Sequence, residues 1–273
     1  MSEYERQQQI MNILYQKQSL STDELIKIFH VSPATIRRDL RKLADKGLVM
    51  RYKGGASLPK IGFGHEPPLA ERESKNLRAK RAIGEAASRL IKDGEVIALD
   101  VGTTCMELAK AIRNHRNITV FTYSLPIAYK LSNSKVNVYL VGGLLKPKEM
   151  CLSGPVARNT ISQFHFDKFF LGAAGITEKE GITDFGMDEV EIKRSFIERS
   201  NEVITLVDSS KFGHVSFITI CQLEKIKQIV TDEGIDPQIL NNLRKKGVNI
   251  TVVSGTEEEI NKINKSHNKK EEV

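Results

Sequence analysis

The sequence predicts an α/β protein made of two parts, a short helical module and a larger domain with a mostly parallel sheet. Three observations lead to this prediction. Capped amphipathic helices dominate a module over residues 1–57, prolines and glycines are frequent in residues 58–74, and apolar strand-like runs alternate with helices over residues 75–255. The 273 residues suffice for a small module, one domain with a proper core and a polar tail over residues 256–273.

The bulk composition is typical of a soluble globular protein. Hydrophobic residues make up 40% of the chain and charged residues 27%. No apolar run approaches the ~20 residues that cross a bilayer, and the chain begins with a polar helix rather than a signal peptide. Cys105, Cys151 and Cys221 are far apart and match no metal-ligand spacing. We therefore expect a cytoplasmic protein with reduced thiols and no bound metal.

The net charge of +7 is concentrated in one segment. Residues 32–60 hold eight basic side chains and two acidic ones, a local charge of +6: Arg37, Arg38, Arg41, Lys42, Lys46, Arg51, Lys53 and Lys60 against Asp39 and Asp45. Such a local excess indicates a polyanionic partner rather than a general aid to solubility.

Two short helices joined by a tight turn are predicted at the start of this segment. Ser21 and Glu24 have the spacing of a capping box, and the helix that follows places its apolar residues at i, i+3 and i+4. Ser32 caps the next helix, which has Pro33 in its first turn, leaves basic side chains on its outer face and ends at Gly47. This is the plan of a helix-turn-helix, whose second helix enters the major groove of DNA.

Residues 48–56 alternate in polarity and end in two glycines, as a small β-wing does. A basic helical face can also bind a protein, but here the caps, the apolar periodicity and the wing all favour DNA. We expect the candidate DNA-binding residues on the second helix to contact base edges and those on the wing to contact phosphates. They are Ser32, Ala34, Thr35, Arg37, Arg38, Arg41, Arg51 and Lys53.

The same segment resembles a known family. The run from Val31 to Leu40, followed by Gly54-Gly55-Ala56 after the wing, is similar to the signature of the DeoR family of bacterial sugar-metabolism regulators. Lys53 departs from the family pattern, which usually has His there, but it keeps a hydrogen-bond donor near the DNA backbone. The resemblance implies a winged helix-turn-helix that binds an operator in double-stranded DNA.

The larger domain is predicted from alternating apolar strands and helices, which together form a mostly parallel sheet covered on both faces. The expected strands span residues 95–99, 118–121, 136–141, 168–171, 202–207, 228–231 and 249–253. The expected helices span residues 75–91, 104–112, 158–163, 188–199 and 237–245.

Polar or glycine-rich motifs follow five of these strands, at the edge where such sheets bind ligands. In the first, Gly102 with Thr103 and Thr104 opens a helix after Asp100, and backbone amides at a helix N-terminus can hold a phosphate. Each motif alone is also typical of an ordinary turn, yet together they favour an anionic polar ligand. The candidate effector-binding residues from these motifs are Asp100, Gly102, Thr103, Thr104, Thr122, Ser124, Gly142, Gly143, Gly172, Gly175, Asp208 and Lys211.

The larger domain also resembles the DeoR-type sensor domain, over residues 71–233. That domain is similar to the sugar-phosphate isomerase fold and binds phosphorylated sugars or related metabolites in the family. The resemblance adds Glu191 and Lys193 to the candidate effector-binding residues. Tyr123 departs from the pattern, because the family commonly has Asn there. If its side chain touches the sugar, the effector or its orientation differs from that of common members.

Two functions remain open on the sequence. The first is a DNA-binding transcriptional regulator, a repressor of carbohydrate-metabolism genes that a phosphorylated sugar controls. The second is a sugar-phosphate isomerase-like enzyme fused to a DNA-binding module, with general bases among Asp100, Asp184, Asp188, Glu189 and Glu191. No base is paired with a second proton-handling group, which favours the regulator. The sequence has neither a Walker loop nor a G-x-G-x-x-G motif, so no nucleotide cofactor is expected.

A homodimer or a dimer of dimers is also expected. One winged module buries too little surface for tight specificity, and paired half-sites supply the rest. The larger domain is the expected place for the contact between subunits.

Overall fold

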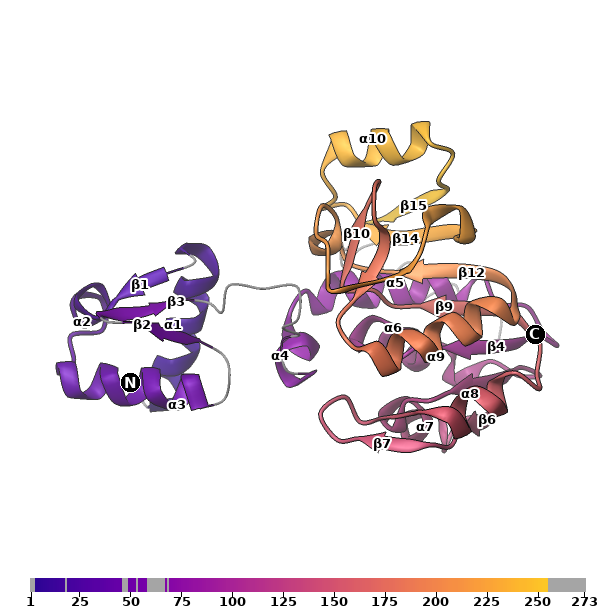
Figure 1. Ribbon diagram of the computed structural model, residues 1–273, viewed down its shortest axis with the longest axis horizontal. Coiled ribbons are helices and arrows are strands. Elements are labelled where there is room, and N and C mark those ends of the chain that lie inside the picture. The colour runs from indigo at the N-terminus through magenta and orange to yellow at the C-terminus, as the bar shows by residue number, and fades with distance from the viewer. Residues whose placement is uncertain are drawn as a thin grey trace, which may run out of the picture. The chain divides into compact units, whose positions relative to one another are not determined.

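The computed structural model describes residues 3–17, 19–45, 49–52, 54–57, 67 and 69–254. The chain divides after Pro68 into two compact units, each with its own hydrophobic core. Figure 1 labels the elements of both units. Lys53, Gly47 and the tail over residues 256–273 lie outside the described residues, so the expectations for them are not addressed by the structure.

The N-terminal unit combines three helices with a small antiparallel sheet of strand order β1-β3-β2. Its helices are α1 (Glu3–Lys17), α2 (Thr22–Phe29) and α3 (Pro33–Asp45), and its strands are β1 (Ser19–Ser21), β2 (Met50–Tyr52) and β3 (Gly55–Ser57). The fold is the predicted winged helix-turn-helix, with β2 and β3 as the wing. The sequence did not predict β1, which has three residues and only Leu20 buried.

Local hydrogen bonds fix the ends of these helices. The Glu24 N–H donates to the Ser21 hydroxyl at 3.1 Å, and the Ser21 N–H donates to the Glu24 carboxylate at 2.9 Å, so the predicted capping box is present. The next helix begins where the Thr35 N–H donates to the Ser32 hydroxyl at 3.2 Å. Between them, His30 adopts a left-handed conformation with φ of 51°, which ends α2 and makes the tight turn.

The C-terminal unit is built on a seven-stranded sheet in which every neighbouring pair is parallel. Its strand order is β15-β14-β12-β9-β4-β5-β6. All seven strands expected from the sequence belong to it, with ends that differ by at most two residues: β4 (Val96–Leu99), β5 (Thr119–Thr122), β6 (Asn137–Leu140), β9 (Phe166–Leu171), β12 (Ser200–Leu206), β14 (Gln228–Asp232) and β15 (Ile250–Val253).

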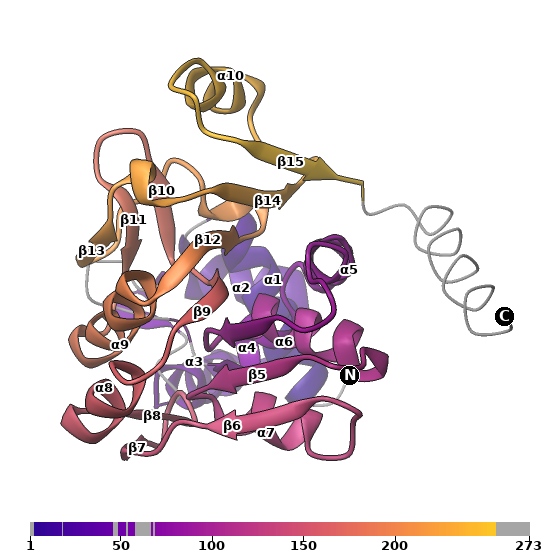
Figure 2. The ribbon, with the colours of Figure 1, turned by 90° about the vertical axis from the view of Figure 1, so that its right-hand side faces the viewer.

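Helices cover both faces of this sheet, as Figure 2 shows with the sheet seen nearly edge-on. On one face, buried residues of α5 (Leu77–Ser88), α6 (Thr103–Ala111) and α7 (Leu125–Leu131) form one core cluster with the strands. On the other face lie α8 (Pro155–Ile161), α9 (Met187–Glu198), α10 (Pro237–Lys245) and a three-stranded antiparallel sheet of β10 (Gly175–Thr177), β11 (Gly181–Asp184) and β13 (Ile218–Cys221). The α/β class is therefore confirmed.

The structure corrects several expectations of detail. The segment expected as a linker, residues 58–74, contains the helix α4 (Leu69–Ser74), which belongs to the C-terminal unit. The hairpin of β7 (Leu144–Lys146) and β8 (Cys151–Ser153) was not predicted, nor were α7 and the antiparallel sheet. Helix α8 begins at Pro155 rather than at residue 158, because proline suits the first turn of a helix. No described helix is long and apolar enough to span a membrane.

Candidate functional site

Helix α3 presents a basic face to solvent in the N-terminal unit. Ile36, Leu40 and Leu43 bury its inner face in the core, which turns the arginines at the intervening positions outward. Arg37, Arg38 and Arg41 are all exposed, and within the described part of the chain they form no hydrogen bond or ion pair. Unpaired guanidinium groups on a rigid helix are ready to bind base edges or phosphates.

The other candidate DNA-binding residues surround this face. Ser32 and Ala34 are exposed in the first turn of α3, whereas Thr35 is half-buried and its hydroxyl lies 2.9 Å from that of Ser32. Arg51 is exposed on β2, opposite Ala56 of β3. The described candidates thus lie on α3 and the wing, and their contact with DNA stays a prediction; Lys53 is outside the described residues.

A buried ion pair fixes the orientation of α3, and the sequence did not assign it. Asp39 has no exposed surface, and its carboxylate accepts hydrogen bonds from Arg6 of α1 at 2.6 Å and 3.3 Å and from Gln7 at 3.4 Å. A detectable signal existed: Asp39 follows Ile36 by three residues and precedes Leu43 by four, so it lies on the apolar face of a basic helix. A buried acid at that spacing requires a cationic partner.

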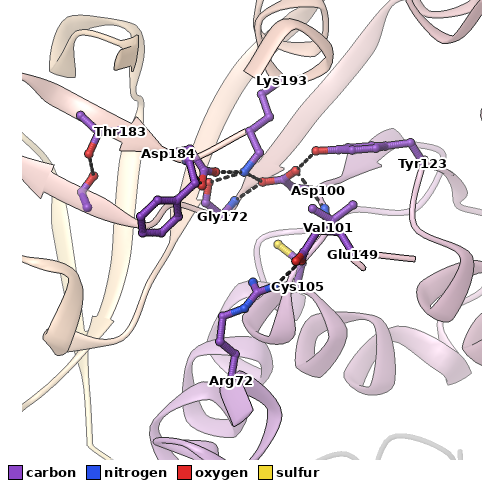
Figure 3. Close-up of polar contacts among 12 residues, drawn as sticks. Arg72, Asp100, Val101, Cys105, Tyr123, Glu149, Gly172, Thr183, Asp184 and Lys193 are labelled. Carbon is purple, nitrogen blue, oxygen red and sulfur yellow. Dashed lines mark hydrogen bonds and ion pairs between the residues drawn. The ribbon is translucent and has the colours of Figure 1, made fainter. Parts of the chain in front are cut away.

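In the C-terminal unit, Asp100 lies directly after β4 and is fully buried. Figure 3 shows its carboxylate surrounded by donors. It accepts hydrogen bonds from the Val101 N–H at 2.9 Å, the Gly172 N–H at 2.7 Å and the Tyr123 hydroxyl, and it pairs with the Lys193 ammonium at 2.9 Å. These four donors occupy the carboxylate, so Asp100 shapes the strand ends rather than offering a free oxygen.

Lys193 projects from α9 into the same buried cluster. Its ammonium contacts Asp100 and Asp184, the last residue of β11, and donates to the Gly172 carbonyl at 3.3 Å. Burial alone would lower the pKa of Lys193, but the two carboxylates raise it well above its ordinary value. Burial raises the pKa of Asp100. The lysine therefore remains charged and holds two strands and a helix together.

Tyr123, the departure from the family pattern, is part of this cluster. Its side chain has no exposed surface, its hydroxyl donates to Asp100, and its ring stacks on Phe196 with centroids 6.0 Å apart. Tyr123 therefore holds the Asp100 carboxylate through a buried hydrogen bond and does not line an open pocket.

A shallow pocket lies beside this cluster at the N-terminus of α6. Gly102 precedes the helix with φ of 106°, a conformation that favours glycine, and supplies no side-chain cap to the first-turn amides. Three of the predicted effector residues meet here, because the pocket is lined by Gly102, Thr103, Ser124, Met106, Pro126, Leu69, Glu73 and Glu149. Uncapped amides beside a threonine hydroxyl can bind an anion.

Helix α4 closes one side of the pocket, although the sequence predicted no helix there. Leu69 and Glu73 line the pocket from α4, and Arg72 forms an ion pair with Glu149, which precedes β8 (Figure 3). The Lys80 ammonium of α5 donates to the Arg72 carbonyl. The first helix of the C-terminal unit is thus anchored to the site by charged contacts.

Lys80 and Lys211 form a basic cluster around Asp208, which follows β12. Lys80 is buried and Lys211 is half-buried, and neither makes an ion pair with a carboxylate among the described residues. Burial lowers the pKa of Lys80 to about 8 and also lowers the pKa of Lys211. The Asp208 carboxylate is already hydrogen-bonded to Asn76 at 2.8 Å and to the Ser210 N–H at 3.1 Å. Sequence reasoning found Lys211 but missed Lys80.

Five other candidate effector residues have structural contacts of their own. A Cβ on Gly143 or Gly175 would lie 2.4 Å from a backbone oxygen, so both glycines permit close packing. The Thr122 hydroxyl accepts the Ser124 N–H at 3.2 Å, and Thr104 is buried in α6. Glu191 is turned away to the surface, where it pairs with Arg158 of α8 at 2.7 Å.

Gly142 is exposed after β6, and a Cβ there would meet nothing within 4 Å. No group of His, Cys, Asp and Glu in the described part of the chain could hold a metal ion.

A winged helix-turn-helix followed by an α/β unit with a parallel sheet is the architecture of a class of DNA-binding regulators. Residues 6–61 match the DeoR-like helix-turn-helix domain, and residues 75–233 match the DeoR C terminal sensor domain. The chain therefore belongs to the DeoR family of transcriptional regulators, which confirms the resemblance seen in the sequence. It is a regulator and not an enzyme.

Curated relatives span almost the whole chain. The HTH-type transcriptional regulator YulB of Bacillus subtilis is 36% identical over 251 residues, 91% of this chain and 96% of YulB. The glycerol-3-phosphate regulon repressor of Escherichia coli is 33% identical over 233 residues, 85% of this chain and 92% of the repressor. Among solved structures, ribose 5-phosphate isomerase A of Methanocaldococcus jannaschii aligns with a TM-score of 0.39 and 19% identity, covering 50% of this chain and 55% of the isomerase.

Proposed function

We propose that this chain represses carbohydrate-metabolism genes and that a phosphorylated sugar, bound at the strand ends of the C-terminal unit, releases it from its operator. One observation carries the effector class. Lys80 and Lys211 are removed from much of the solvent without a carboxylate in ion-pair contact among the described residues. Burying two ammonium groups beside the single Asp208 carboxylate is costly, so an anionic ligand whose oxygens reach these lysines would stabilise this site.

The size of the site suits a phosphorylated sugar. The pocket at Gly102 and Thr103 follows β4, the basic cluster follows β12, and β9 lies between these two strands. Two strand spacings correspond to about 10 Å. A phosphate at the α6 N-terminus would therefore leave the sugar hydroxyls extending toward Lys211. The name of the Escherichia coli repressor, which refers to glycerol 3-phosphate, agrees with a small phosphorylated ligand.

The operator is proposed to be read by α3. Arg37 and Arg38 are exposed on a helix that Arg6 and Asp39 hold in place, so their guanidinium groups can approach base edges without a costly rearrangement. The wing residue Arg51 would contact a phosphate. Repression would follow from occupancy of the operator by the effector-free protein.

A thermal-shift panel tests the effector class directly. Glycerol 3-phosphate, ribose 5-phosphate and glucose 6-phosphate are compared with glycerol, ribose and glucose on the purified chain. We expect at least one phosphorylated compound to raise the Tm by mass action, and its unphosphorylated parent to have no effect. A parent sugar that acts as strongly as its phosphate would contradict the proposal.

Two variants then locate the site. Thr103→Val keeps the shape but removes a hydroxyl, and Lys211→Met removes a positive charge. Each variant should weaken binding of the phosphosugar found in the panel by roughly 1.5–3 kcal/mol, the usual contribution of a charge-assisted hydrogen bond. Calorimetry measures the affinity. Lys179→Met is the matched control, because Lys179 is almost fully exposed and should leave affinity unchanged. Unchanged affinity in both site variants would place the pocket elsewhere.

A further inference from the structure

One end of the C-terminal unit has a concentration of exposed apolar side chains. Among the described residues of this unit, eleven large hydrophobic side chains are exposed, and eight of them lie between residues 139 and 187. We call six of these the apolar edge: Tyr139, Leu144, Leu145, Val156, Phe164 and Met187. They come from β6, the β7–β8 hairpin and the segments around α8 and α9. Figures 1 and 2 both place β6, β7 and α8 together at this end of the unit.

Contacts between these elements show that they adjoin one another. Tyr139 and Phe164 both pack on the ring of Phe121, with centroid distances of 4.6 Å and 4.8 Å. A Cβ on Gly143, just before β7, would lie 3.2 Å from the Cβ of Ala157 in α8. Lys146 of β7 pairs with Asp188 of α9, next to Met187. Strand, hairpin and both helices therefore lie side by side at this end of the unit.

The backbone at this edge is also unprotected. β6 is the last strand of the sheet and, among the described residues, pairs only with β5. Residues 136–141 contain no charged residue and no proline, the usual devices that keep an edge strand from pairing with another chain. A soluble protein that leaves such an edge open risks aggregation, so we expect a specific partner to cover it.

We propose that the apolar edge is the contact surface between two copies of this chain, related by a two-fold axis. Six half-exposed large side chains offer on the order of 700 Å², close to the ~800 Å² per partner of a standard protein interface. The charges beside them are balanced, because Lys146 pairs with Asp188 and Arg158 with Glu191, so the surface favours neither an acidic nor a basic partner. The choice of a second copy rests on the proposed function, since an operator with two half-sites needs a symmetric dimer.

Sedimentation equilibrium of the full chain without DNA tests this interface. The main variant combines Val156→Asp and Met187→Asp. Both residues lie in the first turn of a helix, where a carboxylate suits the helix dipole, so the fold should be retained. Phe217→Asp is the control, because Phe217 is as exposed as Tyr139 but precedes β13 in the other sheet. Circular dichroism and the melting temperature check the fold of each variant.

We expect a wild-type dimer at micromolar concentration, a dimer dissociation constant raised about 30-fold or more in the double variant, and no change in the control. A wild-type monomer, or a double variant that is folded and still dimeric, would overturn the proposal. Tyr139→Ser, at the opposite end of the apolar edge, should weaken the dimer independently. Because neither DNA nor sugar is present, failure of this interface is distinguishable from failure of the proposed function, which the phosphosugar panel tests.

Discussion

The two units use charged side chains in opposite ways. On α3 the arginines are exposed and unpaired among the described residues, so their charge is available to a partner and contributes little to the fold. At the strand ends of the C-terminal unit, Asp100, Asp184 and Lys193 are buried against one another. Removing a charge from α3 should therefore weaken DNA binding, whereas removing one from this buried cluster should lower the stability of the fold.

The largest effect is expected from Lys193→Met. This change leaves Asp100 and Asp184 buried without their cation, and breaking a buried pair in this way costs about 3–5 kcal/mol. Urea unfolding of the purified variant measures the loss. Part of the stability should return as the pH falls, because protonation removes the unpaired negative charge. A variant with wild-type stability would show that the cluster does not hold the strand ends together.

Arg38→Ala should show the opposite behaviour. Operator affinity should fall by about 1–3 kcal/mol, the contribution of a base-reading arginine, whereas the free energy of unfolding should change by less than about 0.5 kcal/mol. Fluorescence anisotropy with operator DNA measures the first and urea unfolding the second. Arg89→Ala, an exposed arginine after α5, serves as the control and should alter neither. Normal operator binding by the Arg38 variant would remove that residue from the recognition surface.

The comparison also explains how much the sequence could predict. The seven strands of the parallel sheet are apolar runs such as Phe169-Phe170-Leu171, and burial on both faces makes that pattern visible. The exposed arginines of α3 were equally visible, because a helical period separates them from Ile36 and Leu40. Both signals are local in the sequence.

What the sequence did not reveal depends on contacts between distant segments. Lys80 lies 128 residues before Asp208, and nothing near it in sequence indicates that the two interact. Glu191 fits the family pattern but turns toward Arg158 on the surface. The strands β7, β8 and β10 have only three residues each, too few for a periodic pattern.

The pH dependence of binding should further distinguish the buried Lys80 of the C-terminal unit from the exposed arginines of α3. Lys80 has a pKa of about 8 in the folded chain, below its ordinary value of 10.5, so it loses its proton as the pH rises through 8. Phosphosugar affinity should therefore be level just below pH 8 and fall by up to about tenfold per pH unit above it. Calorimetry across this range measures the effect. By linkage, the lowered pKa also means that the ligand-free fold gains stability between about pH 8 and 10.5.

Operator binding should not share this profile, because the exposed guanidinium groups of α3 stay protonated throughout. Lys80→Arg tests the assignment, since a permanent charge at this position should flatten the decline in phosphosugar affinity. A decline that persists unchanged in Lys80→Arg would assign the titration to another group.

The smallest effect is expected at the capping box of the N-terminal unit. Ser21→Ala removes the acceptor for the Glu24 N–H and should cost about 1 kcal/mol of unfolding free energy. Differential scanning calorimetry of the full chain should resolve the lower melting temperature, and the phosphosugar affinity should remain unchanged. A loss of unfolding free energy larger than that caused by Lys193→Met would contradict the contrast between the two units.

A phosphosugar at the strand ends of the C-terminal unit should control the occupancy of DNA by α3. Operator affinity is measured by anisotropy in wild type and Lys211→Met, with and without the phosphosugar that raises the wild-type Tm. We predict that the ligand weakens operator binding at least about fivefold in wild type. Bound operator should weaken ligand binding by the same factor. Lys211→Met should bind the operator normally and fail to respond. An equal response in the variant, or no response in wild type, would contradict the account.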